Sequence, residues 1–203
     1  MNPYLRTPPV VKNLIIANAL LFLATWLIPA FNTLMGTYGQ LFWIGSPNFH
    51  SYQFISYMFL HGSFSHLFFN MFALWMFGRT LEYELGSRRF LIYYMVCGIG
   101  AALLQMLVAW IGGEYYFTML GASGAVMGLL MAFGVMHPNE QIFIFPLPFP
   151  IKAKWFVVGY IALELFQGWG GFDAGVAHFA HVGGMLWGYL LLHYWKKRGN
   201  IYF

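Results

Sequence analysis

The sequence is poor in charged residues. Only 8% of its 203 residues are charged, six acidic and ten basic, whereas 60% are hydrophobic and 21% are aromatic. A soluble domain carries about 25% charged residues, and so few charges cannot cover a surface that faces water. This scarcity excludes an ordinary soluble domain and predicts a multi-pass protein of the lipid bilayer.

Cysteine is nearly absent as well. The single cysteine, Cys97, excludes an intrachain disulfide and a cysteine-based zinc site. It lies in an apolar run, so we interpret it as a thiol packed in the core. The net charge of +4 is attributed to the one-sided distribution of Lys and Arg in membrane proteins, and we expect no nucleic-acid partner.

Long stretches without charge divide the chain into candidate membrane spans, each of which needs about 20 apolar residues. The first stretch is too long for one helix, and its middle is rich in turn-forming and aromatic residues, which indicates a loop at the membrane interface. We predict an all-α membrane protein, a six-helix transmembrane bundle with a membrane-associated first loop, in one domain over residues 1–203. The predicted spans are roughly 13–32, 60–78, 90–110, 121–137, 153–170 and 175–195.

The basic residues predict the orientation of the bundle. All ten lie before the first span, in the second and fourth connections, or after the last span: Arg6, Lys12, Arg79, Arg88, Arg89, Lys152, Lys154, Lys196, Lys197 and Arg198. Basic residues accumulate on the cytoplasmic side of membrane proteins. We therefore expect both termini in the cytoplasm, with the second, fourth and sixth spans running from the outside to the inside.

Polar side chains within spans are costly and are therefore functional candidates. Three clusters lie in the outer parts of the second, fourth and sixth spans: His61, His66 and Asn70; Gly121, Ser123 and Gly124; and His178, His181, Gly184 and Gly188. Because these three spans are parallel, the clusters are expected at similar depths.

Two glycine pairs predict that the fourth and sixth spans touch. Pairs of small residues four positions apart, Gly124 with Gly128 and Gly184 with Gly188, allow close approach of helix backbones in lipid. This contact would bring a serine hydroxyl, a poor nucleophile without a base, within reach of a histidine in the facing helix.

The remaining polar groups suit an oxyanion site. His66 and Asn70 share one helix face and, with the backbone N–H of Ser123, can donate hydrogen bonds to a developing negative charge. Neither the fourth nor the sixth span has an acidic residue at this depth, which favours a Ser123–His181 dyad over a triad. Taken singly, such a serine is usually a helix cap and such a histidine often a packing residue; their combination favours catalysis.

These motifs resemble those of the rhomboid intramembrane serine proteases, of the basic six-helix bacterial type. The matching segments are His61-Gly-Ser-Phe-Ser-His66-Leu-Phe-Phe-Asn70, Gly121-Ala-Ser123-Gly124 and Ala180-His181-Val-Gly-Gly184 with Gly188, and the resemblance covers nearly the whole chain.

The resemblance implies a function and a role for each residue. Ser123 is expected as nucleophile, His181 as general base, and His66 and Asn70 as oxyanion donors, while His61 braces the first loop. It further implies cleavage of transmembrane protein substrates without a cofactor or metal, in a bacterial cytoplasmic membrane, at a water-filled site open to the outer side.

The sequence departs from the family pattern at two places. Tyr52-Gln53 replaces a common Trp-Arg pair, which leaves the bracing of the first loop open. Met127 replaces a tyrosine that often stacks on the catalytic histidine, although a thioether can also pack against a ring. Glu164, the only acid within a span, could pair with a neighbour or face a cavity, and we interpret His178 as structural.

Two alternatives remain beside the protease. A catalytically silent rhomboid-like chaperone would bind transmembrane helices without cutting them; a missing serine or histidine would mark it, and both are present. A metal-dependent membrane protein would use His61, His66, His178 and His181, but the chain has no HExxH motif and no carboxylate beside them.

Overall fold

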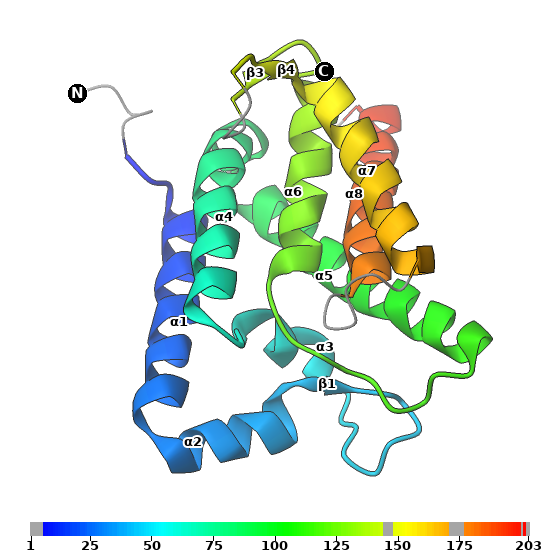
Figure 1. Cartoon of the computed structure of the whole chain (residues 1–203). Helices are drawn as coiled ribbons and strands as arrows, with labels where there is room; N and C mark the ends of the chain where they lie inside the picture. The colour runs from blue at the N-terminus through cyan, green and yellow to red at the C-terminus, as the bar shows by residue number, and fades with distance from the viewer. Residues whose placement is uncertain (1–5, 144–147, 171–176, 200, 202–203) are drawn as a thin grey trace.

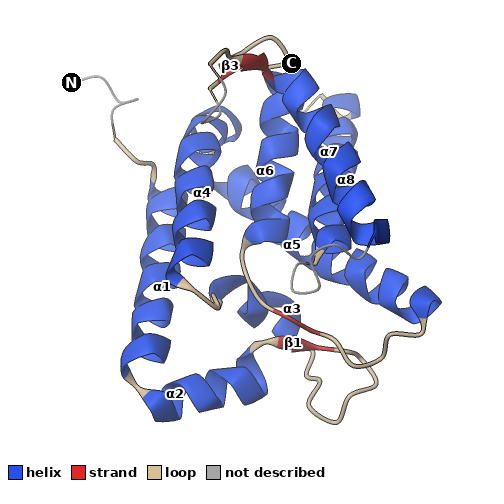
Figure 2. Ribbon diagram, viewed as in Figure 1, coloured by secondary structure: helices blue, strands red, loops and turns tan. Residues whose placement is uncertain are grey.

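The structure, a computed structural model, describes residues 6–143, 148–170, 177–199 and 201. Helices dominate it (Figures 1 and 2). The helices are α1 (Pro9–Leu27), α2 (Pro29–Leu34), the π-helical turn Met35–Gly39, α3 (Gln53–Ser56), the 3₁₀ turn Tyr57–Phe59, α4 (Phe64–Leu85), α5 (Ser87–Gly112), α6 (Ser123–Met136), α7 (Ala153–Gly170) and α8 (His178–Lys197). The strands are β1 (Leu41–Phe42), β2 (Thr118–Met119), β3 (Gln141–Ile142) and β4 (Ile151–Lys152).

The predicted all-α fold is confirmed, and each predicted span overlaps one long helix: α1, α4, α5, α6, α7 or α8. By length and composition, α1 and α5 are apolar enough to cross a membrane, and α6 is a shorter apolar helix. The count of six membrane crossings stays a prediction.

Two predicted span ends differ from the helices. The first span was predicted to run to residue 32, but α1 ends at Leu27 and Pro29 opens α2 as its first residue, a position where the missing proline N–H costs nothing. The second was predicted to end at residue 78, but α4 continues to Leu85 and stops where Gly86 adopts φ +76°. Both ends were predicted wrongly because apolar composition indicates which part of a helix faces lipid, whereas it does not indicate where the helix ends.

The short helix α6 lies at the centre of the bundle and contacts α4, α5, α7 and α8 (Figure 1). Most of its side chains are small or apolar and buried. Helices α4, α6 and α8 begin at one end of the bundle, and α1, α5 and α7 begin at the other (Figure 1). This alternation places the starts of α4, α6 and α8 near one another.

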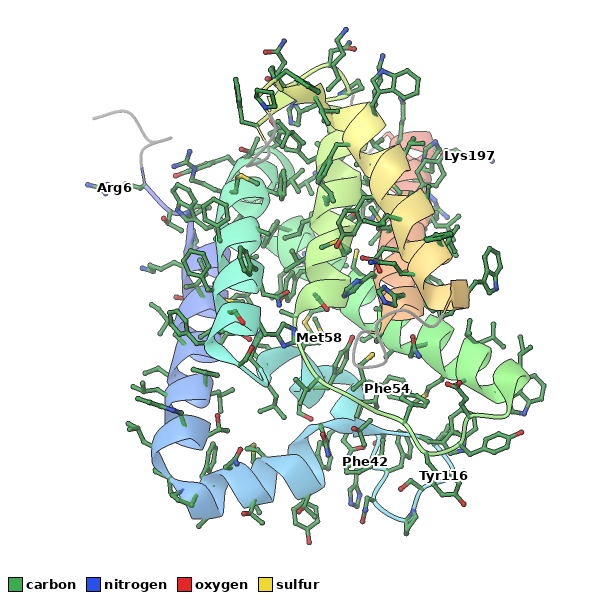
Figure 3. All side chains as sticks on the ribbon, viewed as in Figure 1. Arg6, Phe42, Phe54, Met58, Tyr116 and Lys197 are labelled. Atoms are coloured by element: carbon green, nitrogen blue, oxygen red, sulfur yellow. The ribbon has the colours of Figure 1, made fainter. Side chains whose placement is uncertain are left out.

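The two ends of the bundle differ in composition. Arg6 and Lys197 lie toward one end, whereas Phe42 and Tyr116 lie toward the other (Figure 3). The first end carries the basic residues that frame α1 and α8, and the second carries the aromatic first loop. This separation agrees with the one-sided charge distribution seen in the sequence.

The first loop is tied to the segment that leads into α6. Strand β1 pairs antiparallel with β2, with Leu41 opposite Met119 and Phe42 opposite Thr118 (Figure 2). Just beyond β2, the Gly121 N–H donates to the carbonyl oxygen of Tyr57 at 2.9 Å. The loop therefore fixes the backbone immediately before Ser123.

Gln53 holds the first loop together from its centre. Its side chain is fully buried. The amide oxygen accepts from the N–H groups of Phe42 and His50 at 3.3 and 3.2 Å, and the amide nitrogen donates to the carbonyls of Tyr38 and Asn48 at 3.1 and 2.9 Å. The bracing that the sequence left open at Tyr52-Gln53 is thus supplied by one glutamine.

Tyr57 anchors the same loop to α5. Its hydroxyl donates to the carbonyl oxygen of Gly98 at 2.7 Å, and the residue is 1% exposed. Burial raises the pKa of Tyr57 well above its ordinary value, and the neighbouring Tyr94 and Cys97 act in the same direction. The phenol is therefore a permanent hydrogen-bond donor.

Candidate active site

Ser123 is the first residue of α6 and is half-buried. Gly121 and Ala122 lead the chain into α6, and Gly121 has φ +121°. A Cβ atom at Gly121 would lie 2.7 Å from Cε1 and Nε2 of the His66 ring and 3.8 Å from the Ser123 hydroxyl oxygen. Glycine is required at position 121 because the backbone has a positive φ and because a side chain there would collide with the His66 ring. Without that side chain, the His66 ring can approach Ser123.

His181 lies in the first turn of α8 and faces Ser123. Its Nε2 is 2.8 Å from the Ser123 Oγ. The distance follows from direct backbone contact between α6 and α8: a Cβ on Gly184 would overlap the carbonyl oxygen of Gly124, and one on Gly128 would lie 3.1 Å from the carbonyl oxygen of Gly184. The helix approach inferred from the two glycine pairs is therefore present.

Helix α5 packs against the same interface between α6 and α8. A Cβ at Gly188 would overlap the hydroxyl of Tyr93, which itself donates to the Gly128 carbonyl at 2.8 Å. Cys97 faces both Gly128 and Gly188 and is fully buried. Its placement agrees with the interpretation of Cys97 as a core thiol.

His66 and Asn70 lie one turn apart on one face of α4. Ser63 caps this helix by accepting from the His66 N–H at 3.1 Å. The Asn70 amide, 6% exposed, donates one hydrogen bond to the His66 carbonyl at 2.8 Å and keeps a second N–H. The His66 ring lies against Gly121. The structure thus places the His66 ring beside the residues that lead into α6, and the approach of Asn70 to Ser123 stays a prediction.

His61 is buried directly before α4. Its ring packs edge-on against His66, with ring centroids 5.0 Å apart. The residue therefore contacts the candidate oxyanion donor, and its expected role in bracing the first loop stays a prediction.

The acidic partner of His181 comes from α7 and was not found from the sequence. Glu164 is 3% exposed, and its Oε1 lies 3.0 Å from Nδ1 of His181. Its Oε2 lies 2.7 Å from Nδ1 of His178. The expectation of a dyad without an acidic partner is corrected by this contact, because the acid comes from α7 and not from the fourth or the sixth span.

Met127 lies one turn after Ser123 and is half-buried against the hydrophobic core. In the part of the chain that the structure describes, no ring stacks face to face on His181. Its ring neighbour is His178, edge-on at 6.5 Å between centroids. The orientation of His181 is thus set by its two hydrogen-bonding nitrogens.

Within residues 6–143, 148–170 and 177–199, no group of three or more His, Cys, Asp or Glu side chains is placed to hold a metal ion.

Comparison with known proteins identifies the family. A rhomboid domain model matches residues 48–198. The chain is 35% identical over 153 residues to Rhomboid protein 1, mitochondrial, of Saccharomyces cerevisiae, covering 68% of this chain and 40% of that protein. It is 32% identical over 147 residues to Rhomboid protease AarA of Providencia stuartii, covering 66% and 52%.

A third relative aligns over most of this chain. The presenilin-associated rhomboid-like protein, mitochondrial, of Rattus norvegicus is 31% identical over 201 residues, covering 93% of this chain and 50% of that protein. The chain spans between 40% and 52% of the length of these three relatives.

The relatives also bear on location. Two of the three are mitochondrial by name, so the predicted bacterial cytoplasmic membrane is not supported.

The family match begins in the first loop and ends just after α8, and it therefore includes all three polar clusters. The resemblance seen in the sequence is confirmed, and the chain belongs to the rhomboid family of membrane proteins.

Proposed function

We propose that this chain is an intramembrane serine endopeptidase that cleaves transmembrane protein segments near one membrane interface. The observation that carries the proposal is the 2.8 Å contact between Nε2 of His181 and Oγ of Ser123. A hydroxyl and an imidazole at this distance form a nucleophile with its general base.

The proposed reaction follows the serine protease scheme. As Ser123 Oγ attacks a substrate carbonyl, His181 Nε2 takes its proton, and the imidazolium then gives this proton to the leaving amine. Water hydrolyses the acyl-enzyme with His181 again as base. His66, the second N–H of Asn70 and the backbone N–H of Ser123 would stabilise the oxyanion. No step needs a cofactor or a metal.

The arrangement of the bundle supports the site of cleavage. Ser123, His181 and His66 lie in the first turns of α6, α8 and α4. These three helices begin toward the end opposite Arg6 and Lys197 (Figures 1 and 3). With six crossings and the basic end in the cytoplasm or its equivalent compartment, the site opens to the other side. A substrate helix must unwind locally there to expose its carbonyl.

The specific rival is a silent rhomboid-like protein that binds transmembrane helices without cutting them. One relative is named a protease, whereas the names of the presenilin-associated relatives state no activity. The protease is favoured because the nucleophile and the base are in contact and both candidate oxyanion residues are present on α4.

The test uses the purified chain in proteoliposomes with a model transmembrane substrate and a fluorophosphonate probe. We expect cleavage and labelling for the wild type and neither for Ser123→Ala. Ser65→Ala is the matched control, because Ser65 is an exposed serine in the first turn of α4. Cleavage retained in Ser123→Ala would overturn the proposal, and a folded wild type that binds substrate without cutting would favour the silent rival.

A further inference from the structure

We propose that Glu164 is a positioning residue for His181: it fixes which ring nitrogen carries the proton and stabilises the imidazolium formed during catalysis. This inference rests on the proposed function and concerns a residue of α7, a helix that carries none of the three polar clusters. It turns the predicted dyad into a Ser123–His181–Glu164 chain of hydrogen bonds.

The proton assignment follows from the two contacts of the His181 ring. A neutral imidazole donates from one nitrogen and accepts at the other. The carboxylate of Glu164 can only accept, so the Nδ1–H of His181 donates to Oε1 at 3.0 Å. Nε2 is then the nitrogen without a proton, and it is the one that faces Ser123 at 2.8 Å. The ring is held in the form that a general base requires.

The carboxylate is itself held on both oxygens. Its Oε2 accepts from Nδ1 of His178 at 2.7 Å. Because His178 and His181 are three residues apart on α8, both rings lie on one face of that helix. Glu164 bridges them and cannot rotate without losing both bonds. The His178 Nε2 has no hydrogen-bond partner among the described residues, which fits a neutral ring that donates only from Nδ1.

The charge of Glu164 has no basic partner of its own. In the described part of the chain, its ion pairs are those with His178 and His181, at 2.7 and 3.0 Å. A buried carboxylate without Lys or Arg is costly, and the cost falls when a neighbouring imidazole gains a proton. Glu164 therefore favours the transfer of the Ser123 proton to His181.

Glu164 also helps to attach α7 to α8, and the experiment must distinguish this attachment from the positioning of His181. It is the only buried side chain in the second half of α7 among residues 162–170, where Leu163, Phe166 and Trp169 are 48%, 64% and 80% exposed. The carboxylate thus fastens this half of the helix to α8. Loss of activity alone could come from a displaced α7.

The experiment compares wild type, Ser123→Ala, Glu164→Gln and Glu82→Gln in the same proteoliposomes. Glu82 is the matched control: its carboxylate is also buried, but it accepts from the N–H groups of Val10 and Val11 at 2.9 and 2.7 Å, at the start of α1 and away from Ser123. The readouts are kcat and KM separately, the pH profile of kcat/KM, and the thermal unfolding temperature.

We expect Glu164→Gln to lower kcat by about 100-fold with little change in KM, because glutamine can still accept from His181 but carries no charge. The acidic limb of its kcat/KM profile moves to lower pH, since the imidazolium has lost the anion that stabilises it. The other groups that face this pair are Tyr160 on α7, His178 on α8 and His66 on α4, and all are unchanged in the variant.

Glu82→Gln should lower the unfolding temperature and leave kcat and the acidic limb of the folded enzyme unchanged. A Glu164→Gln enzyme with the wild-type kcat and acidic limb would overturn the positioning role while the proposed function stands. A folded protein with a lower kcat and an unmoved acidic limb would assign Glu164 to α7 attachment only. Full activity in Ser123→Ala would overturn both proposals.

Discussion

The carbonyl group of Gly124 lies directly against the Cα atom of Gly184, so α6 and α8 touch backbone to backbone one residue after Ser123. This contact sets the depth at which the serine meets His181. Protein cores and helix interfaces at this density do not accept an added methyl group without displacement. The distance between nucleophile and base is therefore determined by two glycines.

Gly184→Ala should separate the two helices. Its Cβ would overlap the Gly124 carbonyl oxygen, and we expect a loss of about 1–3 kcal/mol of stability together with nearly complete loss of cleavage. The control is Gly159→Ala on the exposed face of α7, where no atom lies within 4 Å of the new Cβ. Thermal unfolding and cleavage assays on both variants check this; equal activity of the two would contradict the proposed contact.

Gly121→Ala should damage the site more than the fold. The new Cβ would lie 2.7 Å from the His66 ring, at a backbone φ of +121°, so we expect the ring to be pushed from Ser123 and kcat to fall about 100-fold. Gly113→Ala is the matched control, because its φ is +74° but no atom lies within 4 Å. That variant should lose about 1–2 kcal/mol of stability and keep its kcat; a kcat loss of the same size there would assign the effect to backbone strain.

Residue spacing along a helix predicts depth and close packing, but it does not predict how a helix is rotated about its axis. The depth of Ser123, His66 and His181 followed from counting residues along parallel spans, and the contact of α6 with α8 followed from paired glycines. Both depend on position along a helix axis. The contact of Glu164 with His181 depends instead on the rotation of α7 about its own axis, and the low contrast between lipid-facing and core-facing residues hides that rotation.

The first loop itself was predicted, but the residue that braces it was not, for a different reason. Gln53 satisfies four polar backbone groups that are distant along the chain or in irregular turns. No periodic pattern marks such a residue. A usable signal would have been an uncharged amide in an aromatic-rich loop, since buried backbone groups in that setting need a side chain with both donors and acceptors.

Gln53→Ala should loosen the first loop. Removal of the amide leaves two N–H groups and two carbonyls of the half-buried loop without their partner, so we expect a loss of about 1–3 kcal/mol of stability. Faster proteolysis within residues 35–52 should accompany it. Gln40→Ala, which removes one exposed bond to the Gly36 carbonyl, should change stability by about 0.5 kcal/mol or less. Similar losses in the two variants would mean that Gln53 is not the brace.

Tyr57→Phe tests the hydrogen bond that anchors the first loop to α5, because this bond should make the stability of the wild type depend on pH. The folded state keeps the Tyr57 phenol protonated because burial raises its pKa well above the ordinary value, whereas the unfolded chain ionises near pH 10. The stabilisation is therefore complete below pH 10 and is lost as the pH rises, by up to about 1.4 kcal/mol per pH unit. Phenylalanine removes this dependence, and it also leaves the Gly98 carbonyl without its donor.

At pH 8 we accordingly expect Tyr57→Phe to be about 1–2 kcal/mol less stable than the wild type, with the difference narrowing between pH 10 and 11.5 in denaturant titrations. Tyr116→Phe is the control, because Tyr116 is 100% exposed and lies away from the contact between Tyr57 and α5. That variant should follow the wild-type curve at every pH. A Tyr57→Phe curve parallel to the wild type above pH 10 would show that the phenol ionises without unfolding the loop, and the hydrogen bond to Gly98 would then not be the anchor.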